Sequence, residues 1–274
     1  MNQKLDLSLI LPCFNEGETF QENVPKILET LDSLRLSYEV IFVDDGSQDG
    51  TRGLILSALT QYPDKTLRHI FHEKNLGRGA AVRTGFAAAQ GSVRGFIDID
   101  LEVRADYILP CWLALENGAD VAVGRRIYRV YWHSLFRHFL SRGYAGLVRL
   151  VLQLPFRDTE SGYKFFREEA LAQLLPVATN PGWFWDTQVM TYAHRMRYRV
   201  VEIPCLFQRR FDKTSTVKPF REALAYLRHL WRARIELRSR PELLVRTQEP
   251  AAHGQKRPNH PGRPEASTLI SASR

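Results

Sequence analysis

Short apolar runs alternate with longer amphipathic segments along the first 125 residues. The runs, several of them rich in valine and isoleucine, are typical of buried parallel strands, and the segments between them have the length of helices. This alternation predicts a doubly wound α/β sheet with right-handed crossovers. The predicted strands cover residues 7–11, 39–43, 67–71, 95–99 and 120–123, and the predicted helices cover residues 18–34, 51–61, 79–90 and 105–117.

The pattern changes after residue 125. Residues 125–154 contain six arginines and no acidic residue, interleaved with aromatic and aliphatic side chains, and they could form a helix with one basic and one apolar face. Residues 168–175 resemble a helix and 199–207 a strand. In 219–238 apolar residues recur at three- and four-residue steps, which predicts an amphipathic helix. The chain becomes polar and rich in proline from residue 239, so we expect a disordered tail over 239–274.

The composition narrows the class of protein. The chain has 274 residues, of which 44% are hydrophobic and 25% charged, which is a globular balance. The formal net charge of +8 indicates an anionic partner: a nucleic acid, a membrane surface or a phosphorylated substrate. Three widely separated cysteines argue against a disulfide framework or a zinc ribbon. Because no apolar run approaches ~20 residues and the first is too short for a signal peptide, we expect a cytosolic protein without a membrane-spanning helix.

Polar side chains follow each of the five predicted strands of the first half. Ligands of an open parallel sheet bind beyond the carboxyl ends of its strands, so these side chains are candidates for a common site. The site would combine carboxylates with arginines, a pairing that is less usual than polar loops alone. The residues concerned are Pro12, Asn15 and Glu16, then Asp44 and Asp45, then Asn75 to Gly79, then Asp98, Asp100 and Glu102, and finally Arg125 and Arg126.

Each group has a functional and an ordinary interpretation. In an extended segment Asp98 and Asp100 would lie on one side with Glu102 next in step, and such carboxylates suit Mg²⁺ or Mn²⁺, which bridges diphosphate oxygens; alternatively, the acids only mark a loop. Asp44 and Asp45 could accept hydrogen bonds from a nucleobase or ribose, or they could form a turn that caps a helix. The NLGRG segment is either a plain loop or a close approach to a ligand, with Arg78 near phosphate. It is neither a dinucleotide-binding fingerprint nor a P-loop.

Together these motifs are far more specific than any one alone. SLILPCFNEGE, EVIFVDDGSQDGT, NLGRGAAVRTGFAAAQG and FIDIDLE, in this order, resemble the inverting family-2 glycosyltransferases of the GT-A fold. Further along, VGRR, DTESGYKFF, WFWDTQVM and EIPCLFQRR resemble the polyprenyl-phosphate branch, which contains dolichyl-phosphate mannosyl- and glucosyltransferases. RDTESGYKFF is closer to the RDT-x-x-G-x-K-x-F pattern of the glucosyl enzymes.

The resemblance implies an architecture. The fold would be a GT-A domain over residues 1–218, an α/β, Rossmann-like fold with a doubly wound, mostly parallel sheet. Its nucleotide-sugar half would cover about residues 6–125 and its acceptor half about 126–218. The amphipathic helix of 219–238 and the tail would follow it.

The resemblance also implies roles for individual residues. Pro12, Phe14 and Glu16 would border the nucleoside, with Phe14 where the family often has tyrosine. Val43 and Asp45, with Asp44 as a further candidate, would hold the base and the ribose. Asp98, Asp100 and Glu102 would hold Mg²⁺ or Mn²⁺, and the family often has glutamine at the last of these positions. Arg126 would meet the acceptor or donor phosphate. A late arginine and lysine would close on the phosphates, and the candidates are Arg209, Arg210, Lys213 and Lys218.

The implied reaction transfers a hexose from UDP-glucose or GDP-mannose to a polyprenyl or dolichyl phosphate with inversion. Asp100, through the metal, and Arg126 would stabilise the departing diphosphate. A phosphate acceptor needs little help from a base, whereas a hydroxyl acceptor would need one, for which Asp158, Glu160 and Asp186 are candidates. The WFWD segment is more typical of core packing than of sugar stacking. We expect the enzyme to bind the cytoplasmic membrane face peripherally, through the basic and aromatic stretches 128–154 and 219–238.

Three alternatives differ in their observable chemistry. A family-2 glycosyltransferase that uses a hydroxyl-bearing glycan or glycolipid would share the donor site. A basic nucleic-acid-binding protein would explain the arginines but leave the acidic strand ends unexplained, so we expect no nucleic-acid partner. A nucleotidyltransferase should have a glycine-rich, basic loop after the first strand, and CFNEGE is not one. The sequence makes no prediction about the oligomeric state.

Overall fold

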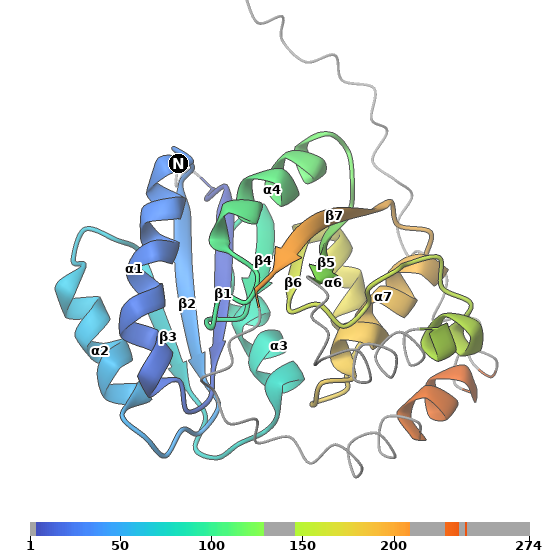
Figure 1. Cartoon of the computed structure of the whole chain (residues 1–274), viewed down its shortest axis with the longest axis horizontal. Helices are drawn as coiled ribbons and strands as arrows, with labels where there is room; N and C mark the ends of the chain where they lie inside the picture. Colours follow the sequence, from blue (N-terminus) through green and yellow to red (C-terminus); the bar gives the residue numbers. More distant parts are fainter. Residues whose placement is uncertain (1–3, 129–145, 209–227, 236–238, 240–274) are drawn as a thin grey trace, which may run out of the picture.

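The computed structural model describes residues 4–128, 146–208, 228–235 and 239, and the following description concerns these residues. A seven-stranded sheet forms the centre of the molecule, and its strands lie in the order β3-β2-β1-β4-β6-β5-β7 (Figure 1). The strands are β1 Leu7–Cys13, β2 Tyr38–Asp44, β3 Leu67–Phe71, β4 Val93–Ile97, β5 Val121–Tyr128, β6 Tyr163–Arg167 and β7 Val200–Phe207.

The sheet is mostly parallel, as predicted, with one exception. β3, β2, β1 and β4 pair in parallel, and so do β5 and β7. β6 is antiparallel to both of its neighbours, β4 and β5, and joins the two parallel parts. The five strands predicted in the first half are confirmed to within a few residues, and so is the strand over 199–207. β6 was not predicted, because its five residues follow a polar loop and have a lysine in their midst.

Helices cover both faces of this sheet. One face packs against α1 Gly17–Ser33, α2 Thr51–Gln61 and α4 Ile108–Glu116, the last preceded by the short 3-10 turn η1 Ala105–Tyr107. The other face packs against α3 Arg78–Ala88, α6 Glu168–Leu174 and α7 Trp185–Arg195. The alternation of a strand is visible in β1, where Leu9 and Leu11 join the first cluster and Ile10 joins the second.

Two further helical segments, 146–152 and 228–235, pack on the α7 side of the sheet. Leu230 and Ala233 are buried there, and the Arg234 guanidinium donates to the carbonyl of Val151, so the two segments touch. The helix predicted over 219–238 is thus confirmed for 228–235. Its other residues, and the predicted tail apart from residue 239, lie outside the described part of the chain. In the parts that the structure describes, no helix has the length and apolar character that crossing a membrane requires.

Candidate functional site

The loops that follow β1 and β2 are tied together at the carboxyl edge of the sheet. The backbone N–H of Asn15 donates to Ser47 Oγ (2.9 Å), and the N–H of Gln48 donates to Asn15 Oδ1 (2.9 Å). The N–H of Gly17 donates to Asp49 Oδ2 (3.0 Å). Asn15 adopts the left-handed conformation with a φ of 55°, which asparagine tolerates better than most residues. These bonds give the two loops a fixed shape, which is the requirement for a preformed nucleoside site.

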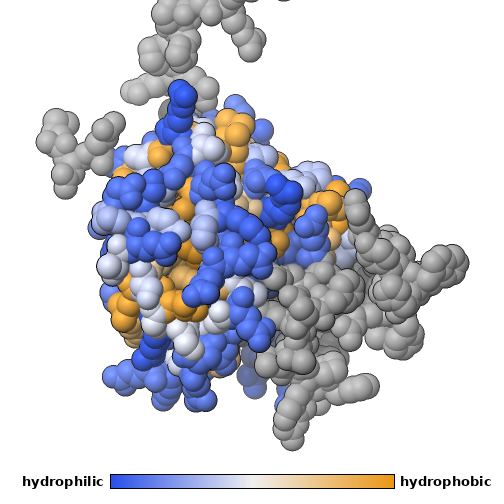
Figure 2. Space-filling model, turned by 60° about the vertical axis from the view of Figure 1, so that its left-hand side comes forward, coloured by the Kyte–Doolittle hydropathy of each residue, from blue (hydrophilic) through white to orange (hydrophobic). Residues whose placement is uncertain are grey.

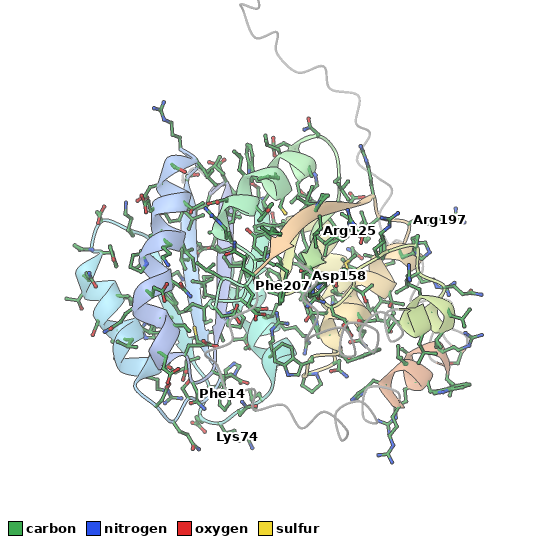
Figure 3. The ribbon with its side chains drawn as sticks, in the orientation of Figure 1. Phe14, Lys74, Arg125, Asp158, Arg197 and Phe207 are labelled. Atoms are coloured by element: carbon green, nitrogen blue, oxygen red, sulfur yellow. The ribbon has the colours of Figure 1, made fainter. Side chains whose placement is uncertain are left out.

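The residues expected to border the nucleoside differ in their accessibility. Phe14 is 42% exposed and lies at the lower edge of the molecule in Figure 3. Pro12 lies near the end of β1, and the Glu16 carboxylate accepts a hydrogen bond from the Thr19 hydroxyl (2.7 Å) at the start of α1. The side chain of Val43 is fully buried in the core. The phenyl ring of Phe14 therefore remains accessible for stacking on a base, whereas the side chain of Val43 does not.

Asp44 is fully buried and engaged by protein groups. Its Oδ2 accepts a hydrogen bond from Arg52 Nε (2.7 Å), and its two oxygens lie 3.3 Å from the backbone nitrogen of Ser47. The Arg52 guanidinium also lies 5.2 Å from the centre of the Phe71 ring. Asp44 therefore shapes the loop after β2, as the interpretation as a turn predicts, but it does not cap the next helix, because the N-cap of α2 is Gly50 without a side-chain cap.

Asp45 organises the loop that precedes α3. Its Oδ1 lies 2.7 Å from His72 Nδ1 and accepts from the backbone N–H of Leu76 (2.9 Å), and its Oδ2 accepts from the N–H of Gly77 (2.8 Å). The other ring nitrogen of His72 lies 3.1 Å from the Thr84 hydroxyl. Both oxygens of Asp45 are thus occupied within the protein, and the NLGRG loop depends on them for its position.

Arg78, the first residue of α3, lies between two carboxylates. Its Nε (3.0 Å) and Nη2 (2.6 Å) both contact Oδ1 of Asp98, and its Nη1 donates to Oδ2 of Asp186. Trp183 covers the guanidinium at 4.8 Å from the ring centre. The expected contact of Arg78 with a phosphate stays a prediction, because in the structure its charge is balanced by these carboxylates.

Behind Arg78 lies a second cation, Lys164 of β6. Lys164 is fully buried, and its Nζ donates to Asp186 Oδ1 (2.6 Å) and to the carbonyl of Ser161. Burial lowers the pKa of Lys164 below its ordinary value, although the carboxylate of Asp186 opposes that shift. Because cations engage both oxygens of Asp186, that residue is poorly placed to act as a general base.

The acidic segment after β4 is folded into a turn. The backbone N–H of Leu101 approaches the carbonyl of Asp98 (3.3 Å), and Leu101 has a φ of 53°. The expected alternation of Asp98, Asp100 and Glu102 along an extended segment is therefore wrong, because the chain reverses direction at this point. In the parts of the chain covered by the structure, no three or more His, Cys, Asp or Glu side chains are gathered so that they could hold a metal ion.

Asp98 and Asp100 remain the candidates for the protein ligands of a divalent cation. Burial raises the pKa of Asp98, Arg78 lowers it, and the carboxylates of Asp100 and Asp186 raise it again. The negative charges of Asp98 and Asp100 thus repel one another, and a cation between them would relieve this repulsion. Two protein carboxylates suffice for Mg²⁺ or Mn²⁺ when substrate phosphates supply further ligands. Glu102 is not needed for such a site.

Arg126 of β5 forms a bidentate ion pair with Asp158. Its Nε lies 2.7 Å from Oδ2 and its Nη2 lies 2.9 Å from Oδ1, and its backbone N–H also donates to Oδ2 (3.0 Å). The guanidinium lies 5.7 Å from the Tyr128 ring and 5.8 Å from the Phe207 ring. Asp158 and Phe207 lie near one another in Figure 3. Although burial raises the pKa of Asp158, the charge of Arg126 holds it below the ordinary value, so Asp158 is ionised but tightly paired.

Glu160 has a different environment from the other two base candidates. Burial raises its pKa to about 7, while Arg126 opposes the shift and Asp158 and Asp186 add to it. Its Oε2 lies 4.0 Å from Arg126 Nη2, and about a third of its side chain is exposed. Glu160 is therefore suited to exchange a proton near neutral pH.

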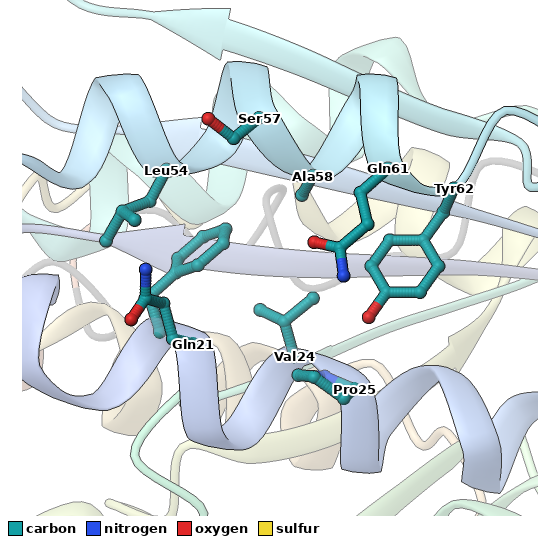
Figure 4. A pocket seen from close by; sticks show the side chains of 9 residues that line it. Gln21, Val24, Pro25, Leu54, Ser57, Ala58, Gln61 and Tyr62 are labelled. Carbon is teal, nitrogen blue, oxygen red and sulfur yellow. The ribbon is translucent and has the colours of Figure 1, made fainter.

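A pocket of about 260 Å³ lies elsewhere, between α1 and α2 (Figure 4). Its lining combines apolar side chains with two glutamines: Phe20, Gln21, Val24, Pro25, Leu54, Ser57, Ala58, Gln61 and Tyr62. Figure 2 shows the molecule with the left-hand side of Figure 1 turned forward. Hydrophobic residues lie among hydrophilic ones on this face. No residue of the predicted site lines this pocket, so it is separate from the carboxyl edge of the sheet.

Three residues of the site were not predicted from the sequence. The position of His72 directly after β3 is a signal for it, whereas Lys164 of the DTESGYKFF segment has no feature in the sequence that distinguishes it from an ordinary lysine. Trp183 is 54% exposed, whereas Phe184 and Trp185 of the same WFWD segment are core residues. The prediction of core packing is therefore correct for two of the three aromatic residues. The late candidates Arg209, Arg210, Lys213 and Lys218 lie outside the described residues.

Comparison with known proteins gives a consistent result. The sequence model of the family "Glycosyl transferase family 2" matches residues 8–175. The chain is 32% identical over 247 residues to "Glycosyltransferase AglD" of Haloferax volcanii, which covers 88% of this chain and 39% of that protein. It is 28% identical over 218 residues to "Dolichyl-phosphate beta-glucosyltransferase" of Drosophila melanogaster (73% and 66%) and 31% identical over 234 residues to "Dolichol-phosphate mannosyltransferase" of Pyrococcus furiosus (83% and 63%). The chain thus spans between 39% and 66% of the length of these relatives.

The fold is shared with solved structures. Glucosyl-3-phosphoglycerate synthase from Mycobacterium tuberculosis, crystallised with Mn²⁺, UDP and phosphoglyceric acid, superposes with a TM-score of 0.61 at 20% identity. The superposition covers 85% of this chain and 78% of that one. At this identity the likeness establishes the fold alone, and it agrees with the predicted arrangement of a mostly parallel sheet between two layers of helices.

Proposed function

Because the chain belongs to glycosyl transferase family 2, we propose that it transfers a hexose from a nucleoside diphosphate sugar to a polyprenyl phosphate. The observation that carries the proposal is that one short segment links the expected donor and acceptor groups. The carbonyl of Gly162 accepts a hydrogen bond from the N–H of Asp98 (3.2 Å), and Asp158 holds Arg126. The donor-side carboxylate and the acceptor-side arginine are thus anchored to positions only four residues apart in the chain.

The charges of the site suit a departing diphosphate. Asp98 and Asp100 would hold Mg²⁺ or Mn²⁺, which when bound neutralises the charge that develops on the leaving nucleoside diphosphate. Phe14 offers an exposed ring to the base, between loops that are fixed by hydrogen bonds. Arg126 keeps its guanidinium oriented through Asp158, so that its remaining surface is presented in a fixed direction to a phosphate.

The ion pairs favour a phosphate acceptor over a hydroxyl acceptor. A lipid phosphate is ionised near neutral pH and attacks the anomeric carbon without losing a proton, so it needs no general base. Asp158 and Asp186, two of the three candidates for a base, are both held in ion pairs with arginine or lysine side chains. Resemblance of the RDTESGYKFF segment to the glucosyl branch favours UDP-glucose as the donor, with GDP-mannose as the other candidate.

A second candidate function rests on Glu160. A pKa raised to about 7 is suited to a group that removes a proton from a hydroxyl, and Glu160 lies beside Arg126. A family-2 enzyme acting on a hydroxyl-bearing glycan or glycolipid would use it in this way. Replacement of Glu160 by glutamine would then abolish transfer to the hydroxyl, whereas transfer to a phosphate would continue.

Membrane contact follows from the nature of a lipid acceptor. Helical residues 146–152 and 228–235 expose large apolar side chains, with Leu150 at 76% and Trp231 at 63% exposure, next to several exposed arginines. An apolar and aromatic surface with basic neighbours is typical of proteins that bind an anionic bilayer without crossing it. The three cysteines, all of which the structure describes, form no disulfide bond, which fits the proposed place at the cytoplasmic face.

A donor and acceptor screen tests the function. The purified chain is incubated with UDP- or GDP-hexoses, with Mn²⁺, Mg²⁺ or a chelator, and with either a polyprenyl phosphate or the matching polyprenol. We expect labelled hexose in the lipid fraction, release of UDP or GDP, an inverted anomeric centre by NMR, and no transfer with the chelator or with Asp100→Ala. Release of pyrophosphate would identify a nucleotidyltransferase instead, and transfer to polyprenol but not to its phosphate would favour the hydroxyl acceptor.

A further inference from the structure

Four charged side chains form a continuous chain of ion pairs from the interior to the candidate metal site: Lys164, Asp186, Arg78 and Asp98. We propose that Lys164 is a positioning residue, which acts through Asp186 and Arg78 to fix the Asp98 carboxylate for a divalent cation. The inference rests on the proposed function, because it attributes the affinity of the donor site for its cation to these four ion-paired side chains.

Lys164 is anchored where it cannot reach solvent. Its Nζ lies 2.6 Å from Asp186 Oδ1, contacts the carbonyl of Ser161, and lies 5.7 Å from the centre of the Phe96 ring. A fully buried ammonium group is costly unless its hydrogen-bond donors are satisfied, so these partners hold it in one position. Lys164 therefore gives Asp186 a fixed orientation.

Asp186 transmits that orientation to Arg78. One carboxylate oxygen faces Lys164 and the other faces Arg78 Nη1, and both acidic oxygens lie in the interior. The indole ring of Trp183 covers the guanidinium at 4.8 Å. Asp186 at one edge of the Arg78 guanidinium and Trp183 over its face together restrict its orientation.

Arg78 in turn leaves one oxygen of Asp98 available. Its Nε and Nη2 both contact Oδ1 of Asp98, at 3.0 and 2.6 Å. Within the described ranges, Oδ2 of Asp98 accepts no hydrogen bond, and the side chain of Asp98 is 37% exposed. The arrangement therefore fixes the Asp98 carboxylate through Oδ1, and leaves Oδ2, which lies against Gly162, without a hydrogen bond from the described residues, as a preorganised metal ligand requires.

The direction of the change in cation affinity distinguishes a positioning role of Lys164 from a purely electrostatic one. The two cations and two carboxylates balance in charge, so removal of the Lys164 charge leaves the site one unit more negative. A more negative site attracts a divalent cation more strongly. If Lys164 acts by positioning, its loss weakens cation binding instead, because Asp186 and then Arg78 lose their fixed orientation.

The experiment measures Mn²⁺ binding directly and does not depend on turnover. Free Mn²⁺ is titrated by EPR against the full chain with UDP, and again with GDP, and thermal unfolding is recorded for every variant. The variants are Lys164→Met and the charge-balanced double variant Lys164→Met/Asp186→Asn. A matched control is Glu39→Gln, which removes a buried carboxylate that pairs with Arg68 (2.6 Å) near the start of β2.

We expect both Lys164 variants to bind Mn²⁺ at least about tenfold more weakly than the wild type, a loss typical of partners that orient a metal ligand. Glu39→Gln should lower the unfolding temperature without changing the Mn²⁺ affinity. Equal or tighter binding by either folded variant would overturn the inference, and so would failure of both variants to fold, because Lys164 would then be purely structural. If the wild type binds no Mn²⁺ with either nucleotide, the metal site of the proposed function fails as well.

Discussion

Gly162 lies against the Asp98 carboxylate so closely that a β-carbon on residue 162 would overlap both Asp98 Oδ2 and Arg78 Nη2. The same glycine accepts the backbone hydrogen bond of Asp98 through its carbonyl (3.2 Å). Residue 162 must therefore lack a side chain for the pair of Asp98 and Arg78 to exist. The glycine of the DTESGYKFF segment thus makes room for the carboxylate of Asp98, which follows β4.

Replacement of Gly162 by alanine should disrupt that pair. The added methyl group has to displace Asp98 or Arg78, so we expect nucleotide binding in the presence of Mn²⁺ to weaken at least about tenfold, as when an orienting partner is lost. Overpacking should also cost about 1–3 kcal/mol of stability. Isothermal titration calorimetry with UDP or GDP and urea unfolding measure the two effects.

Gly53→Ala is the matched control for this variant. Gly53 lies within α2, and a β-carbon there would have no atom within 4 Å. Because alanine favours a helix over glycine, this variant should gain about 0.5–1 kcal/mol and bind nucleotide normally. Normal nucleotide binding by a folded Gly162→Ala variant would show that the position of Asp98 does not govern the site.

Two fully buried serines should respond in opposite ways to replacement by alanine. The Ser161 hydroxyl has no hydrogen-bond partner among the residues that the structure covers. The Ser8 hydroxyl donates to Glu39 (2.5 Å) and accepts from the N–H of Gly91 (2.8 Å). We expect Ser161→Ala to be neutral or slightly stabilising in urea unfolding, and Ser8→Ala to cost about 1–3 kcal/mol, because it leaves polar partners unpaired.

The Ser161 variant also distinguishes a structural from a ligand-binding role. Ser161 lies beside Lys164 and Gly162, so its hydroxyl is near the ion pairs that lead to Asp98. If Ser161→Ala keeps its stability but loses hexose transfer, the hydroxyl contacts a substrate or an ordered water in the working enzyme. A destabilised Ser161→Ala variant would mean that the hydroxyl has a partner, and the expectation would be wrong.

The sequence predicted this site where its residues follow the carboxyl ends of predicted strands. Asp98, Asp100 and Arg126 were identified because they directly follow or end predicted strands, and the hydrophobic periodicity of the first half was sufficient to place these strands. β6 was not predicted, because the hydrophobic pattern of a five-residue buried strand does not distinguish it from other short apolar runs. The aromatic run at the start of α7 likewise concealed a helix beginning at Trp185.

Contacts between distant residues could not be predicted in the same way. Arg78 meets Asp186 across 108 positions, and Lys164 meets Asp186 across 22. A lysine and an aspartate in a sequence are ordinary surface residues unless burial removes their solvent, and burial is a property of the packed fold. For the same reason the sequence suggested that Asp158 and Asp186 could act as bases, whereas the structure pairs Asp158 with the partly buried Arg126 and Asp186 with the buried Lys164.

Glu160→Gln should change the pH dependence of stability. Burial raises the pKa of Glu160 to about 7, so between its ordinary pKa and that value the folded chain holds a proton that the unfolded chain has lost. Its contribution to stability is complete below the ordinary pKa and is lost as the pH rises through about 7. Glutamine stays neutral, so the variant should be more stable than the wild type at pH 8, by an amount on the order of 1 kcal/mol given the partial exposure of the side chain, and nearly equal to it close to pH 5.

Urea unfolding at several pH values measures this difference. Glu169→Gln, at an exposed position of α6, provides a control that should follow the wild type throughout. A Glu160→Gln variant that is less stable than the wild type at pH 8 would show that the ionised carboxylate is stabilised by Arg126 rather than penalised by burial.

The exposed apolar residues of the two outer helical segments should bind the chain to an anionic bilayer. In the segment 228–235, Leu230 and Ala233 already pack on the core, so Trp231 points away from it. Leu150 of the segment 146–152 is similarly exposed. We expect sedimentation with vesicles of mixed neutral and anionic lipids at low salt, and a loss of about 1 kcal/mol in binding for each basic side chain removed. Trp231→Ser and Leu150→Ser should each reduce the bound fraction, because the insertion of apolar surface is lost.

Leu56→Ser distinguishes membrane binding through these two segments from nonspecific hydrophobic binding. Leu56 is also exposed and large, but it lies on α2, which covers the opposite face of the sheet from residues 228–235. If membrane binding uses the outer helical segments, Leu56→Ser should sediment like the wild type, and salt should release both to the same extent. An equal loss from Leu56→Ser would show that binding has no preferred face. Absence of sedimentation by the folded wild type at low salt would shift the proposed acceptor from a membrane lipid toward a soluble phosphate or glycan, since the enzyme would then have no means of reaching the headgroup plane.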